Sequence, residues 1–211
     1  MTIYNTFSKV IYEKELTLDE KIYDTLYEVK NNSDFWSKDN IQRNNGDVIP
    51  AGASGSNNKF ILDDKKLIAF KDIIMKEFEI FKNEYMSFAY NDFKIITSWF
   101  TSTKTGDKCD FHNHHHCMFS GVFYIAAEEN SGNIVFCPFE NYRFELSVKE
   151  FNINNSHSWY ITPKKGKILF FDSSLFHKIE VNQSNKERIS LAFNLIPIGE
   201  MGVADSYINL G

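Results

Sequence analysis

The residues best suited to chemistry are histidines, because four of the six in the chain lie within residues 112–116, in the stretch FHNHHHC. Residues two apart in a β-strand point to the same face, so His112 and His114 would share one face. A later histidine, His177, opens the segment HKIEV, and Arg188 follows in KERISLAFN. For a lone pair of histidines, a solvated surface strand would be the favoured interpretation. The addition of His177 and Arg188 favours a metal site, because neutral imidazole is a common metal ligand.

Two different pairs of histidines would lie on one face of a strand. His114 and His116 also share a face, as His112 and His114 do. We expect His112 and His114 to be the pair, because His116 stands close to the segment CMFSG, which turns into the next apolar run.

These spacings resemble those of the iron(II)- and 2-oxoglutarate-dependent dioxygenases, in particular the prolyl-hydroxylase-like branch. The resemblance covers about residues 93–196 and is carried by FHNHHHCMFSGVFYI, SGNIVFCPF and KKGKILFFDSSLFHKIEVNQSNKERISLAFN. The chain is also similar to a bacterial and phage group of that superfamily whose substrates are generally unassigned. The resemblance implies a double-stranded β-helix that uses iron(II), 2-oxoglutarate and O2 to hydroxylate an unactivated C–H bond. It implies a prolyl residue of a peptide or protein as substrate, with free amino acids or another small molecule as alternatives.

The resemblance also implies roles for individual residues. The implied metal ligands are His112, His114 and His177. Arg188 would pair with the distal carboxylate of 2-oxoglutarate, for which a planar guanidinium is well suited. The residues implied to line the co-substrate site beside it are Ser190, Tyr124 and Ser120.

His114 departs from the family pattern, which has aspartate as the second ligand. Three neutral imidazoles leave bound iron more positive than two imidazoles and a carboxylate would. Such a ligand set should also bind zinc and nickel well.

The first part of the chain must provide the support for this site. The segment TLDEKIYDTLYEVKNN predicts a helix that starts at Thr17, with a capping box to Glu20. The segment over residues 63–90 predicts a second, longer helix from its apolar periodicity. Residues 44–58, NNGDVIPAGASGSNN, predict a loop that is either a mobile lid or plain slack, with slack favoured.

From residue 93 onward, short runs rich in Ile, Val, Phe and Tyr predict β-strands. These runs are FKIITSWFT, CDFHNH, FSGVFYIAA, GNIVFC, FELSV, SWYIT, KILFF, HKIEV and RISLAFNLIPI. They predict a mainly β fold with N-terminal helices: a double-stranded β-helix, or jelly-roll and cupin-like barrel, flanked by packing helices. We expect a single domain over residues 1–211, with 1–92 as mainly helical support and 93–198 as the β-helix core. Trp99 is expected in the core, with a place at the border of the pocket as the alternative.

The composition of the chain indicates which kinds of partner and which cellular compartment to expect. The chain has 211 residues and a formal net charge of −5, and no basic stripe suits a nucleic acid. No apolar run is long enough to cross a bilayer, and the N-terminus shows no signal peptide. The three cysteines form no CxxC pair and are expected as buried, reduced thiols, with Cys109 or Cys117 as alternative metal ligands. We therefore expect a cytoplasmic protein without nucleic acid or membrane partners, and its oligomeric state stays open.

Two other functions fit parts of the same pattern. A cupin-type metalloprotein acting on a small molecule without 2-oxoglutarate would explain the Gly-x5-His-x-His spacing that starts at Gly106. However, Met118 and Phe119 stand where a cupin has its glutamate. A metal-free jelly-roll binding module would make the histidines incidental, and it leaves the joint presence of His177 and Arg188 unexplained.

Overall fold

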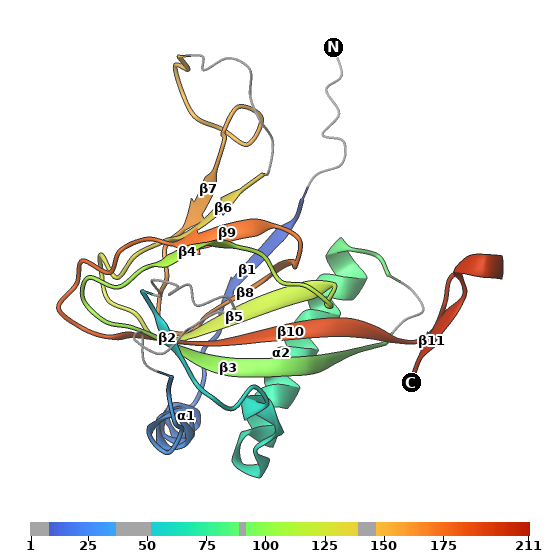
Figure 1. Ribbon diagram of the computed structural model, residues 1–211, viewed down its shortest axis with the longest axis horizontal. Helices are drawn as coiled ribbons and strands as arrows, with labels where there is room; N and C mark the ends of the chain where they lie inside the picture. The colour runs from blue at the N-terminus through green and yellow to red at the C-terminus, as the bar shows by residue number, and fades with distance from the viewer. Residues whose placement is uncertain (1–8, 37–51, 89–91, 139–146) are drawn as a thin grey trace, which may run out of the picture.

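The computed structural model describes residues 9–36, 52–88, 92–138 and 147–211. Two antiparallel β-sheets form the centre of the fold, and two α-helices lie outside one of them (Figure 1). The seven-stranded sheet has the order β1-β8-β5-β10-β3-β2, and β11 pairs with β10. Its strands are β1 (Ile11–Glu15), β2 (Ser54–Gly55), β3 (Asp92–Thr103), β5 (Phe119–Ala126), β8 (Lys167–Asp172), β10 (Arg188–Met201) and β11 (Ile208–Leu210).

The four-stranded sheet has the order β4-β9-β6-β7. Its strands are β4 (Cys109–His112), β6 (Ile134–Cys137), β7 (Trp159–Ile161) and β9 (Phe176–Ile179). Buried side chains of both sheets pack together in a second apolar cluster, which includes Tyr124, Phe136 and Phe171. The chain alternates between the two sheets, which is the double-stranded β-helix that the sequence predicts.

Alternation along the strands decides which side chains reach the space between the sheets. On β10, every second residue joins the larger core under the helices: Ile189, Leu191, Phe193 and Leu195. The residues between them face the other sheet: Arg188, Ser190, Ala192 and Asn194. The same pattern on β5 turns Phe123 toward the helices and Tyr124 toward the other sheet. Strand β10 therefore supplies the apolar core with one face and a polar row with the other.

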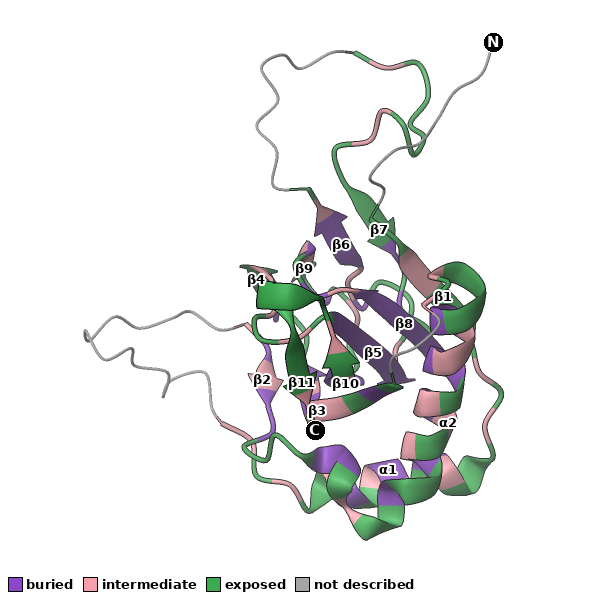
Figure 2. Ribbon diagram, turned by 90° about the vertical axis from the view of Figure 1, so that its right-hand side faces the viewer, coloured by how far each residue is buried: buried purple, intermediate pink, exposed green. Residues whose placement is uncertain are grey.

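Helices α1 (Glu20–Asn31) and α2 (Ile68–Ile80) cover the outer face of the larger sheet, with their buried sides turned toward it (Figure 2). Phe70 of α2 meets Phe123 of β5 edge to face, with 4.9 Å between the ring centroids. Burial of such a side chain stabilises the fold by roughly 1.5–3 kcal/mol. The helices thus fix the outer face of the sheet whose inner face carries Arg188 and Tyr124. Within the described residues, none of the helices has the length and apolar character to cross a membrane.

Both predicted helices exist, but their predicted bounds were wrong. The first begins after Asp19, whose carboxylate accepts from the backbone N–H of Lys21 at 2.9 Å, instead of starting at Thr17. The second is α-helical only over Ile68–Ile80. It is preceded by two 3-10 turns (Ile61–Asp63 and Lys65–Leu67) and followed by a π-helical turn (Phe81–Tyr85). Asp64 interrupts the start, because its side chain caps the second 3-10 turn through the N–H of Lys66.

Other differences lie in short segments. Strands β1, β2 and β11 were not predicted, although β1 extends the larger sheet beside β8. In the predicted loop, residues 44–51 lie outside the described residues, whereas Ser54–Gly55 pair with β3 and so form a strand rather than slack. The predicted strand FELSV lies partly outside the described residues, and its last two residues are not in a strand.

Candidate active site

Three histidines meet between the two sheets. His112 ends β4, His177 lies on β9, and the two are direct Cα partners in the antiparallel pair. His114 follows two residues after the end of β4, and the potential ligand atoms of all three lie within 4.8 Å of one another. The ring centroids of His112 and His177 are 4.3 Å apart, and those of His114 and His177 are 5.2 Å apart. His115 and His116 are exposed and lie outside this cluster.

The hydrogen bonds of the three imidazoles leave the same nitrogen free on each ring. His112 and His177 place Nδ1 2.8 and 3.0 Å from the backbone carbonyl oxygen of the residue two positions earlier. Nδ1 of His114 lies 2.8 Å from Oδ1 of Asn194. Because each of these oxygens can only accept, each Nδ1 carries a proton, and in the neutral ring the lone pair then lies on Nε2. Three lone pairs held in this way form a donor set that fits a divalent metal ion.

A polar network behind His114 fixes the Asn194 side chain. Nδ2 of Asn194 donates to Thr97 Oγ1 at 2.9 Å, which turns its Oδ1 toward His114. Ser120 donates its hydroxyl to the same Oδ1 at 2.8 Å, and its oxygen lies 2.8 Å from Ser173 Oγ. Ser120 was predicted at the co-substrate site. The structure instead engages its hydroxyl beside His114, so we assign it to the support of that ring.

Burial keeps two of these imidazoles neutral. Loss of solvent lowers the pKa of His114 to about 4 and the pKa of His177 to about 3, since burial disfavours the charged ring. A neutral ring is the metal-binding form. The pair is therefore ready to bind a metal across the physiological pH range without first losing protons.

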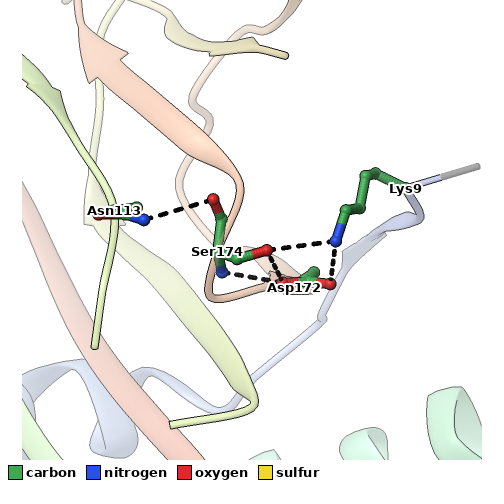
Figure 3. Close-up of polar contacts among 4 residues, drawn as sticks. All are labelled: Lys9, Asn113, Asp172 and Ser174. Carbon is green, nitrogen blue, oxygen red and sulfur yellow. Dashed lines mark hydrogen bonds and ion pairs between the residues drawn. The ribbon is translucent and has the colours of Figure 1, made fainter. Parts of the chain in front are cut away.

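The turn that leads into β9 is tied to the segment that carries His112 and His114. Figure 3 shows Asp172 accepting from both the N–H and the hydroxyl of Ser174, at 2.8 and 2.6 Å, and from Lys9 at 2.6 Å. Asn113 donates to the carbonyl oxygen of Ser174 at 3.5 Å (Figure 3). The backbone N–H of His114 also donates to the carbonyl oxygen of Ser173 at 2.9 Å. These contacts hold the turn before His177 in a fixed position against the residues around His114.

A second group of polar residues surrounds Arg188, which is only 1% exposed. Its Nη1 donates to the carbonyl oxygen of Gly132 at 2.7 Å, and its guanidinium lies 5.7 Å from the ring centre of Tyr124. Within the described part of the chain, four buried polar atoms have no hydrogen-bond partner: Arg188 Nε, Tyr124 Oη, Thr103 Oγ1 and Ser131 Oγ. Buried polar groups are rarely left unpaired, so this cluster is suited to a polar ligand. Burial also raises the pKa of Tyr124 to about 12, so its hydroxyl stays protonated and able to donate.

One pocket of about 160 Å³ brings the three histidines and Arg188 together. The three histidines and Arg188 line it together with Ser190. Its apolar walls come from both sheets and include Val122, Ile134, Phe171 and Ile179. The metal-type donors and the buried cation therefore open onto one space.

The prediction that Trp99 belongs to the core rather than the pocket was wrong. Trp99 lines this pocket, and its ring centroid lies 5.6 Å from that of His114. Its position follows from strand parity, since Trp99 and Thr101 lie on the same face of β3 and both line the pocket. The three cysteines are all free and half-buried, and none belongs to the histidine cluster.

Several residues of the site were missed by sequence reasoning. Asn194 could have been found, because it has the same strand parity as Arg188 and Ser190. Thr103 reaches the site because its Cα pairs with that of Arg188 across β3 and β10. Ser131 lies in the loop before β6, and no local pattern marks it.

The family model described as "Putative 2OG-Fe(II) oxygenase" matches residues 97–194. The match spans both histidine-bearing segments and Arg188. No curated protein matches the chain in sequence.

Solved structures share the fold at low sequence identity. HygX from Streptomyces hygroscopicus, with nickel, 2-oxoglutarate and hygromycin B bound, has a TM-score of 0.61 at 9% identity, over 90% of this chain and 83% of that one. A prolyl hydroxylase from Trichoplax adhaerens, in complex with a peptide fragment of hypoxia inducible factor, has a TM-score of 0.60 at 13% identity, over 88% and 83%. A Pseudomonas putida prolyl-4-hydroxylase has a TM-score of 0.55 at 12% identity, over 89% and 93%. These likenesses confirm the double-stranded β-helix.

Proposed function

We propose that this chain is a 2OG-Fe(II) oxygenase, which the family model matched over residues 97–194 supports, and that it hydroxylates an unactivated C–H bond of a prolyl residue in a peptide or protein. Its cofactor is iron(II) and its co-substrates are 2-oxoglutarate and O2, as in that family. The observation that carries the proposal is the joint presence, in one pocket, of three histidines and a buried, partly unpaired arginine. We treat residues 1–211 as one domain, since β1 and β2 complete the sheet that carries the site.

The residues present fit both groups that the family uses. His112, His114 and His177 would hold the metal through Nε2, the nitrogen that their hydrogen bonds leave free. Arg188 would bind the distal carboxylate of 2-oxoglutarate, and the unpaired hydroxyl of Tyr124 could donate to the same group. Ser190 lies beside Tyr124 in the β10–β5 pairing and faces the same pocket.

Each group of residues has a distinct task in the reaction. When bound, iron(II) with 2-oxoglutarate and O2 supplies an oxidant for a C–H bond, while 2-oxoglutarate is converted to succinate and carbon dioxide. His112, His114 and His177 would hold the metal through imidazole nitrogens. Arg188 would orient the co-substrate, and the apolar walls formed by Val122, Ile134 and Phe171 would keep water away from the reacting atoms.

A peptide substrate is supported by the peptide-bound prolyl hydroxylase that shares the fold. The test is succinate formation from 2-oxoglutarate with iron(II), screened against proline-containing peptides and free amino acids. A hydroxylated peptide, detected as one added oxygen atom by mass spectrometry, is the expected result. Turnover that only a free amino acid stimulates would keep the oxygenase and reject the peptide.

We expect Asn194→Ala to weaken metal binding by about 10- to 100-fold, the range found when a group that orients a metal-binding histidine is lost. The reason is that Oδ1 of Asn194 holds the Nδ1 proton of His114. The zinc affinity of the variant, measured by competition with a chromogenic chelator, gives the size of this loss. Asn194→Asp keeps the acceptor and should retain the affinity. An Asn194→Ala variant that folds and binds zinc as the parent does would contradict this role.

Metal occupancy tests which two of the clustered histidines bind the metal together with His177. His114→Ala should lose most of the bound metal, whereas His114→Asp should keep it and shift the preference from zinc toward iron(II), because a carboxylate lowers the charge at the metal. His116→Ala should be nearly neutral, since His116 is exposed and outside the cluster. If His116→Ala empties the site and His112→Ala does not, the pair is His114 with His116.

A further inference from the structure

Among the described residues, the charged side chains that line the pocket are all positive. Of the described residues that line it, two are cationic, Arg188 and Lys59, and none is an aspartate or glutamate. This contrasts with the chain as a whole, whose formal net charge is −5. A cleft of one sign attracts ligands of the opposite sign and raises their local concentration.

The two cations occupy different depths. Arg188 is buried, whereas Lys59 is exposed and lies in the segment that follows β2, at the outer end of the pocket. The backbone of Lys59 is fixed, because its carbonyl oxygen accepts from the N–H of Ser98 at 2.7 Å, next to Trp99. Its Nζ donates to the carbonyl oxygen of Ser56 at 2.6 Å, and no carboxylate of the described residues pairs with it. Lys59 therefore lies at the exposed side of the pocket, and within the described part of the chain no carboxylate compensates its charge.

Iron(II) and 2-oxoglutarate would not compensate that charge. The dication and the dicarboxylate offset each other, and the three imidazoles that replace the usual two imidazoles and a carboxylate are neutral. Both Arg188 and Lys59 then contribute unbalanced positive charge to the loaded pocket. An aspartate at the position of His114 would have offset one of these charges. A third ligand that carries one negative charge would offset one of the two in its place.

Two tryptophans line the same pocket as Lys59. They are Trp36, before Lys59 in the sequence, and Trp99, after it. Trp36 packs against Gly55 so closely that a Cβ there would lie 2.8 Å from the indole Nε1. Aromatic faces beside a single cation suit a ligand with an apolar body and one anionic end.

We infer that the substrate of this site carries a carboxylate, which Lys59 binds at the exposed side of the pocket while Trp36 and Trp99 hold its apolar part near the histidines. The inference rests on the proposed oxygenase function and deepens it. Lys59 is thus a specificity residue that contacts the substrate rather than the metal. The carboxylate is either that of a free acid or the side chain of an acidic residue next to the target in a peptide.

Matched acids and amides test this in the zinc-loaded protein with 2-oxoglutarate bound, where no turnover occurs. The probes are N-acetyl-L-proline against N-acetyl-L-prolinamide, and the capped dipeptides acetyl-Asp-Pro-amide against acetyl-Asn-Pro-amide, with binding measured by calorimetry. At least one acid should bind about 10- to 100-fold more tightly than its amide, the range for a charge-assisted hydrogen bond. The first pair reports a free acid, and the second reports an acidic peptide.

The Lys59→Met variant should abolish the preference for the acid, and Lys59→Arg should keep it. Lys65→Met is the control, because it removes the same charge from an exposed residue outside the pocket lining. If neither acid binds better than its amide, or if the preference survives in Lys59→Met, the inference is wrong. Iron-dependent succinate formation by the parent protein, measured in parallel, shows whether the oxygenase function itself still holds in that case.

Discussion

His177→Ala should abolish the conversion of 2-oxoglutarate to succinate and reduce metal affinity by orders of magnitude. His177 supplies one of three nitrogen donors and comes from a strand of its own, β9, so neither His112 nor His114 can take its place. The measurements are succinate release and zinc or iron content after dialysis. The fold should persist, because His177 faces a pocket rather than the core under the helices.

His177→Asn is the companion variant, since its amide nitrogen lies where Nδ1 lies and can donate to the carbonyl oxygen of Leu175, while no group remains at the position of Nε2. It should fold like the parent and still lose turnover. Succinate formation that continues in both variants would show that the metal lies among residues 112–116 alone, without β9.

Arg188→Ala should raise the apparent KM for 2-oxoglutarate by roughly 100-fold while iron binding stays intact. A charge-assisted bidentate pair with a carboxylate contributes up to about 3 kcal/mol, and Arg188 is the buried cation beside the unpaired Tyr124 hydroxyl. The kinetics of succinate formation against 2-oxoglutarate concentration give the value.

Two further variants separate the loss of the carboxylate partner from damage to the fold. Arg188→Lys keeps the charge without the planar fork and should fall between the parent and Arg188→Ala. Lys186→Ala changes an exposed cation two residues away and should leave the KM unchanged. A normal KM in a folded Arg188→Ala protein would move the co-substrate site elsewhere.

Strand parity explains most of what could be predicted of the site. The i, i+2 relation brought His112 next to His114, and the same rule put Arg188 and Ser190 on one face of β10, as the structure has them. The apolar runs were short, frequent and separated by turn residues, so the sequence predicted a mainly β barrel with covering helices. The structure confirms this prediction.

Local sequence patterns could not predict which residues of strands far apart in the sequence contact each other. Thr103 faces the Arg188 region only because β3 pairs with β10 in one register, and that register is set by the whole sheet. Trp99 was misplaced because an aromatic residue on a strand suits a core and a pocket wall equally. The acceptor that orients His114 is likewise eighty positions away in sequence, on β10.

We propose that iron(II) and 2-oxoglutarate meet in the pocket formed by the three histidines and Arg188. The visible absorption spectrum of the protein tests this under anaerobic conditions, with iron(II) added first and 2-oxoglutarate second. We expect a weak charge-transfer band that needs both additions and is absent in His177→Ala. A protein that retains stoichiometric iron(II) and shows no spectral change on addition of 2-oxoglutarate would contradict it.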